Sequence, residues 1–123
     1  MEFDIFFSIS QTPDTSGRTP SEREMMSNFF EQVELADELG FGIGWVAQAH
    51  LSTEVQKRNT SPVVPHYHGE VGLCTDFFQV AREMFYRTSE MEVGSAVMSI
   101  LASGVPIAQA ERVGSFIALH GLD

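Results

Sequence analysis

The stretch that most constrains the fold is residues 41–51, FGIGWVAQAHL. Residues 43–49 are a short, mostly apolar run with branched and aromatic side chains, which predicts a buried β-strand. The run follows a glycine-rich turn and delivers a polar pair, Gln48 and His50, at its carboxyl end. In parallel α/β folds the ligands bind at the carboxyl ends of the strands, so we expect this pair to lie near a binding site.

Two further apolar runs predict strands of the same sheet. Residues 3–9, FDIFFSI, are nearly all apolar, as in a strand that is buried on both faces. Residues 92–98, EVGSAVM, contain small side chains that leave room for the close approach of a backbone or a ligand.

Three amphipathic segments predict helices. The first begins at Ser21, which forms a predicted capping box with Glu24, and it ends before Gly40. The second covers residues 73–88, and the third covers residues 106–120 with a proline at its first position. The apolar stripe of the third helix is expected to be buried and comprises Ile107, Ala110, Val113, Gly114 and Ile117.

The resulting order, β-α-β-α-β-α, predicts parallel strands joined by right-handed crossovers. A doubly wound sheet and part of a (β/α)8 TIM barrel both fit, and three units are too few for a closed barrel of about 250 residues. If all helices cover one face, the other face exposes apolar side chains, which predicts missing sequence or a partner. We therefore expect residues 1–123 to be the amino-terminal part of one barrel domain, with a long loop or lid at residues 51–72.

Composition narrows the classes of partner. The net charge of −10, from 17 acidic and 7 basic residues, disfavours nucleic-acid binding. No apolar run is long enough for a membrane helix, and the amino terminus lacks the basic lead of a signal peptide. The single cysteine, Cys74, permits no internal disulfide and fits a packed thiol in a reducing compartment. We expect a cytoplasmic protein without a nucleic-acid or membrane partner.

Taken together, these segments resemble the amino-terminal portion of the bacterial luciferase-like family of flavin-dependent monooxygenases. The matching segments are FDIFFSI at 3–9, LADELGFGIGWVAQAH at 35–50, RTSEMEVGSAVMSI at 87–100, PIAQAER at 106–112 and ALHGLD at 118–123. The resemblance covers nearly the whole chain but only about three of the eight barrel units. It implies a TIM barrel that binds FMN, or the deazaflavin F420 in a sister branch, at the carboxyl ends of its strands.

The resemblance also implies particular site residues. His50 would be the catalytic residue, and the cofactor ring would lie against Ser8, Gln48 and the backbone of Ala96, Val97 and Met98. A non-proline cis peptide is implied in the third strand, at Ala96–Val97. The chain departs from the luciferase branch at Ala49, where relatives have the first histidine of a Glu-His-His sequence, so light-emitting aldehyde oxidation is not expected.

The function implied is oxidation of an organic substrate with O2, with NAD(P)H as the electron source and a flavin reductase as a companion. The resemblance further implies a homo-oligomer that packs through residues 73–88 and 106–120. We expect the isolated 123-residue chain to be inactive. One alternative is a truncated, non-catalytic subunit that binds flavin or depends on a partner.

A further alternative is a metal-dependent hydrolase. It would use His66, His68 and Glu70, whose side chains have the spacing of metal ligands.

Overall fold

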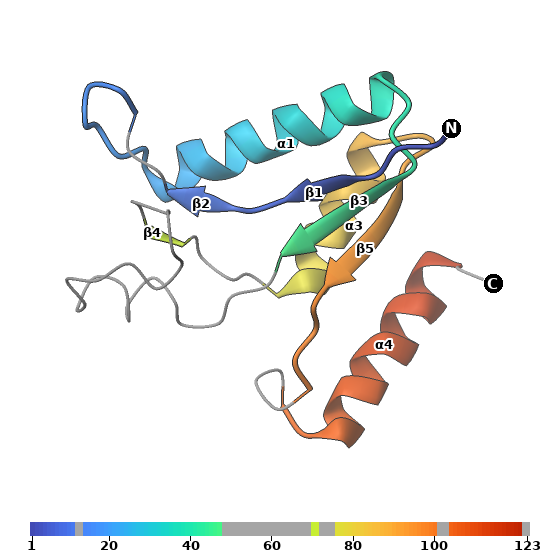
Figure 1. The fold of residues 1–123 in the computed structure, drawn as a ribbon. Coiled ribbons are helices and arrows are strands. Elements are labelled where there is room, and N and C mark those ends of the chain that lie inside the picture. Colours follow the sequence, from blue (N-terminus) through green and yellow to red (C-terminus); the bar gives the residue numbers. More distant parts are fainter. Residues whose placement is uncertain (12–13, 48–69, 72–75, 101–103, 122–123) are drawn as a thin grey trace.

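The computed structural model describes residues 1–11, 14–47, 70–71, 76–100 and 104–121. Its elements in chain order are β1 (Ile5–Phe7), β2 (Ser10–Gln11), α1 (Glu22–Glu38), β3 (Ile43–Ala47), β4 (Glu70–Val71), α3 (Phe77–Arg87), β5 (Glu92–Ala96) and α4 (Pro106–His120) (Figure 1).

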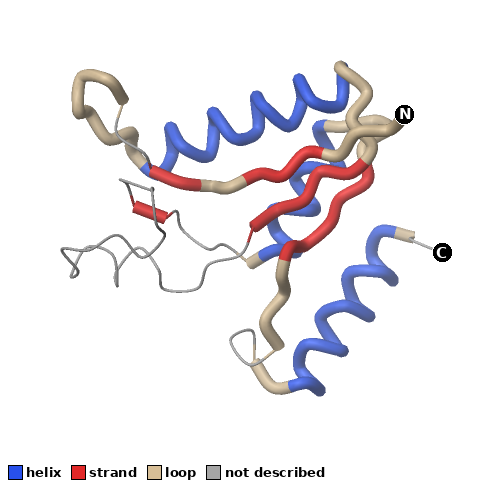
Figure 2. Tube along the Cα trace, viewed as in Figure 1, coloured by secondary structure: helices blue, strands red, loops and turns tan. Residues whose placement is uncertain are grey.

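Strands β1, β3 and β5 form one parallel sheet in the order β1-β3-β5. The register places Phe6, Trp45 and Gly94 in one row across the three strands. The tube in Figure 2 shows these three strands next to one another, and the helices flank the sheet that they form. The predicted mixed α/β class, with parallel strands and three helices, is therefore confirmed at this level.

A second, two-stranded ladder differs from the sequence-based expectation. Strand β2 pairs antiparallel with β4, with Ser10 opposite Val71 and Gln11 opposite Glu70. Residues 3–9 were expected to form one strand, but only Ile5–Phe7 pairs with β3. Residues 70–71 were expected to belong to the long loop. Strand limits depend on the partner strand, which local apolar patterning does not identify.

The amino terminus of α1 confirms half of the predicted capping box. Ser21 is the N-cap, and its Oγ accepts a hydrogen bond from the backbone N–H of Glu24 at 3.2 Å. The Glu24 carboxylate accepts two hydrogen bonds from the Arg18 guanidinium instead, at 3.0 and 2.6 Å. This hydrogen bonding by Arg18 lowers the pKa of Glu24 below its ordinary value.

The carboxyl terminus of α1 ends at the predicted glycine. Gly40 has a φ of +79°, a conformation that glycine adopts without steric cost. Its N–H donates to the carbonyl of Asp37 at 3.0 Å, and the N–H of Phe41 donates to the carbonyl of Ala36 at 3.1 Å. These two bonds form a Schellman motif, which directs the chain into β3.

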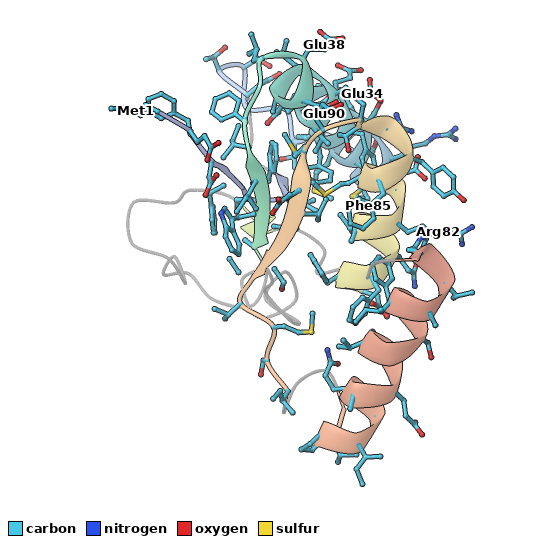
Figure 3. All side chains as sticks on the ribbon, turned by 90° about the vertical axis from the view of Figure 1, so that its right-hand side faces the viewer. Met1, Glu34, Glu38, Arg82, Phe85 and Glu90 are labelled. Carbon is cyan, nitrogen blue, oxygen red and sulfur yellow. The ribbon has the colours of Figure 1, made fainter. Side chains whose placement is uncertain are left out.

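Helices α1 and α3 cover one face of the sheet. Figure 3 shows this arrangement edge-on. The core between these layers comprises Phe7, Ile9, Met25, Phe29, Val33, Ala36, Val46, Val80, Met84 and Met91. On the opposite face Phe6 is 61% exposed and Trp45 is half-buried. The expectation that residues 3–9 are buried on both faces is thus wrong for the described chain, whereas an open apolar face is confirmed.

Helix α4 packs against α3 through aromatic rings. The ring centroid of Phe116 in α4 lies 5.1 Å from that of Phe78 and 6.0 Å from that of Phe85, both in α3. Arg112 of α4 forms an ion pair with Asp76, the N-cap of α3.

The predicted buried stripe of α4 is exposed, which corrects the sequence analysis. Ile107 is 74% exposed, Ile117 is 43% exposed, and Ala110, Val113 and Gly114 are also exposed. Apolar periodicity identified the helix correctly, but the helix turns Phe116 and His120 toward α3 instead. Among the described helices, none is long and apolar enough to cross a membrane.

Candidate functional site

The carboxyl ends of the three parallel strands lie at one edge of the sheet. In the register, Phe7 of β1, Val46 of β3 and Ser95 of β5 form one row near this edge (Figure 1). Ser8 follows β1 directly, and Val97 follows β5 directly. Because neighbouring strands are about 4.8 Å apart, the backbones of Phe7 and Ser95, which lie just before these residues, are separated by roughly 10 Å across β3. The structure therefore brings both predicted cofactor-binding segments to the same edge.

Ser8 is exposed and lines a cavity of about 340 Å³. The cavity lies between the carboxyl end of β1 and α1, and its other lining residues are Phe7, Ile9, Pro20, Met25, Asn28, Phe29 and Gln32. The lining combines apolar side chains with one hydroxyl and two amide side chains. Such a combination can bind a small molecule that has an apolar body and a few hydrogen-bonding groups.

The end of β5 confirms one specific expectation. The peptide bond between Ala96 and Val97 is cis, as the resemblance implies. Ala96 is half-buried, Val97 is 74% exposed, and Met98 is half-buried. The side-chain amide of Gln109, in the first turn of α4, donates a hydrogen bond to the Met98 sulfur.

The small residues of β5 serve a packing role at one position. A Cβ atom at Gly94 would lie 2.4 Å from Cε3 of Trp45, so the indole packs directly against the Gly94 backbone. The indole N–H donates to Oδ2 of Asp4 at 3.2 Å, and Oδ1 of Asp4 accepts from the backbone N–H of Ile43 at 3.1 Å. The sequence predicted that a backbone or a ligand approaches the small residues of β5. At Gly94 the group that approaches is the Trp45 side chain of the same chain.

Several predicted site residues lie outside the described residues. They are Gln48, His50, His66 and His68. Ala49, where the chain departs from the luciferase branch, and Cys74, expected to be a packed thiol, also lie outside the described residues. Glu70 lies in β4, where its backbone pairs with Gln11. In the parts of the chain that the structure does describe, no three His, Cys, Asp or Glu side chains form a group that could hold a metal ion.

The opposite, amino-terminal edge of the sheet is acidic. A cavity of about 600 Å³ there is lined by Glu2, Asp4, Gly42, Ile43, Glu90 and Glu92. Nearby, the Asp37 carboxylate accepts hydrogen bonds from the backbone N–H groups of Ser89, Glu90 and Met91, at 2.8, 3.1 and 2.8 Å. The bond from Ser89, followed by the other two, holds the pKa of Asp37 below its ordinary value.

Sequence reasoning missed the contact between Gln109 and Met98. A signal was present, because Gln109 is a polar side chain in the first turn of a helix with an apolar composition. Periodicity places such a residue on a face, but it does not identify the neighbour.

The comparisons with known proteins do not show which family the chain belongs to. No protein-family model, no curated protein and no solved structure matches the chain.

Proposed function

We propose that this chain carries the amino-terminal part of the cofactor site of a flavin-dependent oxidoreductase, a monooxygenase that oxidises an organic substrate with O2. The observation that carries the proposal is that Ser8 and Ala96–Met98 lie at the same, carboxyl edge of a parallel sheet, on either side of β3. Ligands of open α/β sheets and of barrels bind at this edge.

The described residues fit the ring of a flavin. The exposed hydroxyl of Ser8 and the backbone after β5 offer hydrogen-bonding groups, and the 74% exposed side chain of Val97 offers apolar surface beside them. An isoalloxazine ring has the same combination of an apolar body and polar edges. When bound, the flavin would transfer electrons from NAD(P)H to O2 and the substrate.

Roles follow for the chain's own residues. Ser8 and the backbone of Ala96–Met98 would orient the ring, together with Gln48. His50 would exchange a proton with the bound reactants, a role suited to a side chain whose ordinary pKa is near 6.5. We place the reaction in the cytoplasm, with FMN as the first choice of cofactor and F420 as the second. The proposal extends to a completed TIM barrel, a flavin reductase as companion and a homo-oligomer.

A second candidate is a non-catalytic subunit that binds flavin only when a partner covers the sheet. The open face favours it, because Phe3 and Phe6 are 62% and 61% exposed. Exposed aromatic side chains of this kind are typical of surfaces that another polypeptide covers. The intact mass of the protein in its source cells separates the two candidates, because a mass several times 13.6 kDa indicates that further barrel units are present.

Titration of the purified chain with FMN tests the proposal. We expect quenching of flavin fluorescence with a Kd in the micromolar range, and weaker binding by the variants Ser8→Ala and Val97→Glu. Ser27→Ala, an exposed substitution in α1, is the matched control and should bind as the parent does. If neither FMN nor F420 binds to the chain or to its longer form, the proposal is wrong.

Activity is tested with the longer form of the protein loaded with flavin, because the isolated 123-residue chain is expected to be inactive. With NAD(P)H, a flavin reductase and O2 supplied, we expect an oxidised product to form only when an organic substrate is added. His50→Ala should abolish product formation while FMN affinity changes little. A His50→Ala variant with parental turnover would remove His50 from the proposed mechanism.

A further inference from the structure

Gln109 is the only buried polar side chain among the residues that the structure describes, with 6% of its surface exposed. It lies in the first turn of α4, after an N-cap, Val105, that makes no side-chain capping bond. Side chains in helices point back toward the amino terminus, so the amide of Gln109 extends over this first turn toward the segment that follows β5.

The hydrogen bonds of Gln109 are few for a buried amide. Its Nε2 donates to the Met98 sulfur, which is a weak acceptor, and its Oε1 has no partner. A buried polar atom without a partner costs about 1–3 kcal/mol. A leucine or methionine of similar volume would fill the same space without this cost. Packing alone therefore does not explain a glutamine at this position.

The contact made by Gln109 gives the explanation. Met98 is the last of the three residues whose backbone is proposed to contact the flavin ring. It lies in the sequence between the end of β5 at Ala96 and the start of α4 at Pro106. Gln109 holds the Met98 side chain against α4 from outside this segment. A fixed Met98 restricts where the backbone of Ala96 and Val97 can lie.

We propose that Gln109 is a positioning residue, which acts through Met98 to hold the Ala96–Met98 segment in the geometry that binds the cofactor ring. This inference rests on the proposed function. Groups that contact a ligand are held in place by the residues behind them, and loosening that support lowers affinity without removing any direct contact. The Gln109 amide donates a directional hydrogen bond to Met98, which an apolar side chain cannot do, and it does so although its Oε1 has no partner.

The test compares Gln109→Leu with Gln79→Leu. Both remove an amide from a helix, but Gln79 is exposed on α3, whereas Gln109 is buried in α4. We expect Gln109→Leu to weaken FMN binding about tenfold, which corresponds to about 1.4 kcal/mol. Its melting temperature should equal or exceed that of the parent, because the unpaired oxygen is gone. Gln79→Leu should bind FMN as the parent does.

A measurement without flavin separates this inference from the proposed function. The six methionine methyl groups can be labelled with carbon-13, and the Met98 signal can be assigned with the variant Met98→Leu. We expect one sharp, shifted Met98 signal in the parent and in Gln79→Leu, and an averaged signal in Gln109→Leu.

The outcomes are distinct. A parent that binds neither FMN nor F420, as the isolated chain or in its longer form, overturns the proposed function, whatever the methionine spectrum shows. An unchanged Met98 signal in Gln109→Leu overturns the positioning role. Binding of FMN by Gln109→Leu with parental affinity also overturns it, and so does a melting temperature that falls in step with affinity.

Discussion

Oδ1 of Asp37 accepts a hydrogen bond from the backbone N–H of Met91 at 2.8 Å, although the two residues are 54 positions apart in the sequence. Asp37 lies in the last turn of α1, and Met91 immediately precedes β5. The same carboxylate binds Ser89 and Glu90, so one side chain fixes the start of β5 relative to α1.

Replacement of Asp37 by asparagine should lower the free energy of unfolding by about 1–3 kcal/mol, the usual cost of losing hydrogen bonds to a charged group. An asparagine presents one oxygen to these donors, and its NH2 group faces backbone N–H groups that cannot accept a hydrogen bond. Urea unfolding measures the loss. The neighbouring exposed variant Glu38→Gln is the control, and equal stability of the two variants would contradict the prediction.

The contribution of Asp37 should depend on pH. Its pKa is lower in the folded chain than in the unfolded chain, so its stabilisation is present above the unfolded value of about 3.9 and is lost as the pH falls through the folded pKa. We expect the difference in unfolding free energy between the parent and Asp37→Asn to be constant above about pH 5 and to shrink at lower pH. A difference that grows on acidification would show that the sign is wrong.

Substitution of Gly94 by alanine should displace Trp45. The new Cβ would lie 2.4 Å from Cε3 and 2.5 Å from Cζ3 of the indole, so the ring must move and its bond to Asp4 must break. We expect a loss of about 1–3 kcal/mol in stability, the usual range for overpacking. The chain has one tryptophan, so its emission should shift to longer wavelength without interference.

Gly114→Ala is the control for this substitution. Nothing lies within 4 Å of a Cβ at Gly114, which is exposed in α4. This variant should gain about 0.5–1 kcal/mol, because alanine loses less conformational entropy in a helix. If Gly94→Ala leaves both emission and stability unchanged, the packing of Trp45 against Gly94 is not as described.

Asp76 combines two roles that substitutions can separate. Oδ1 accepts the N-cap hydrogen bond from the N–H of Phe78 at 3.0 Å, and Oδ2 pairs with Arg112 of α4. Asp76→Asn keeps a good N-cap but loses the ion pair, so it should cost at most about 1 kcal/mol. Asp76→Ala also loses the cap and should cost about 1 kcal/mol more. Thermal unfolding measures both, and equal losses would mean that the cap contributes nothing.

Local sequence patterns were sufficient to predict the elements whose limits depend on near neighbours. Ser21 and Gly40 define the ends of α1, and Pro106 begins α4, because capping bonds and backbone preferences act within about one turn. Apolar patterning also predicted the α/β order of the parallel sheet correctly. The resemblance implied the cis peptide at Ala96–Val97, which the structure contains, and it implied that Ser8 and Val97 lie at the same edge of the sheet.

The contacts between distant segments could not be predicted from local patterns and depend on the folded arrangement of the chain. Of residues 3–9 only Ile5–Phe7 became a strand, because β3 provides its partner, and the following Ser10–Gln11 pairs with β4 instead. Helix α4 turned its aromatic side toward α3 rather than its predicted stripe toward the sheet. The bonds of Asp37 to Ser89–Met91 and of Trp45 to Asp4 join residues 41 to 54 positions apart. Local propensity cannot encode such pairs, because their energy depends on where the chain places both partners.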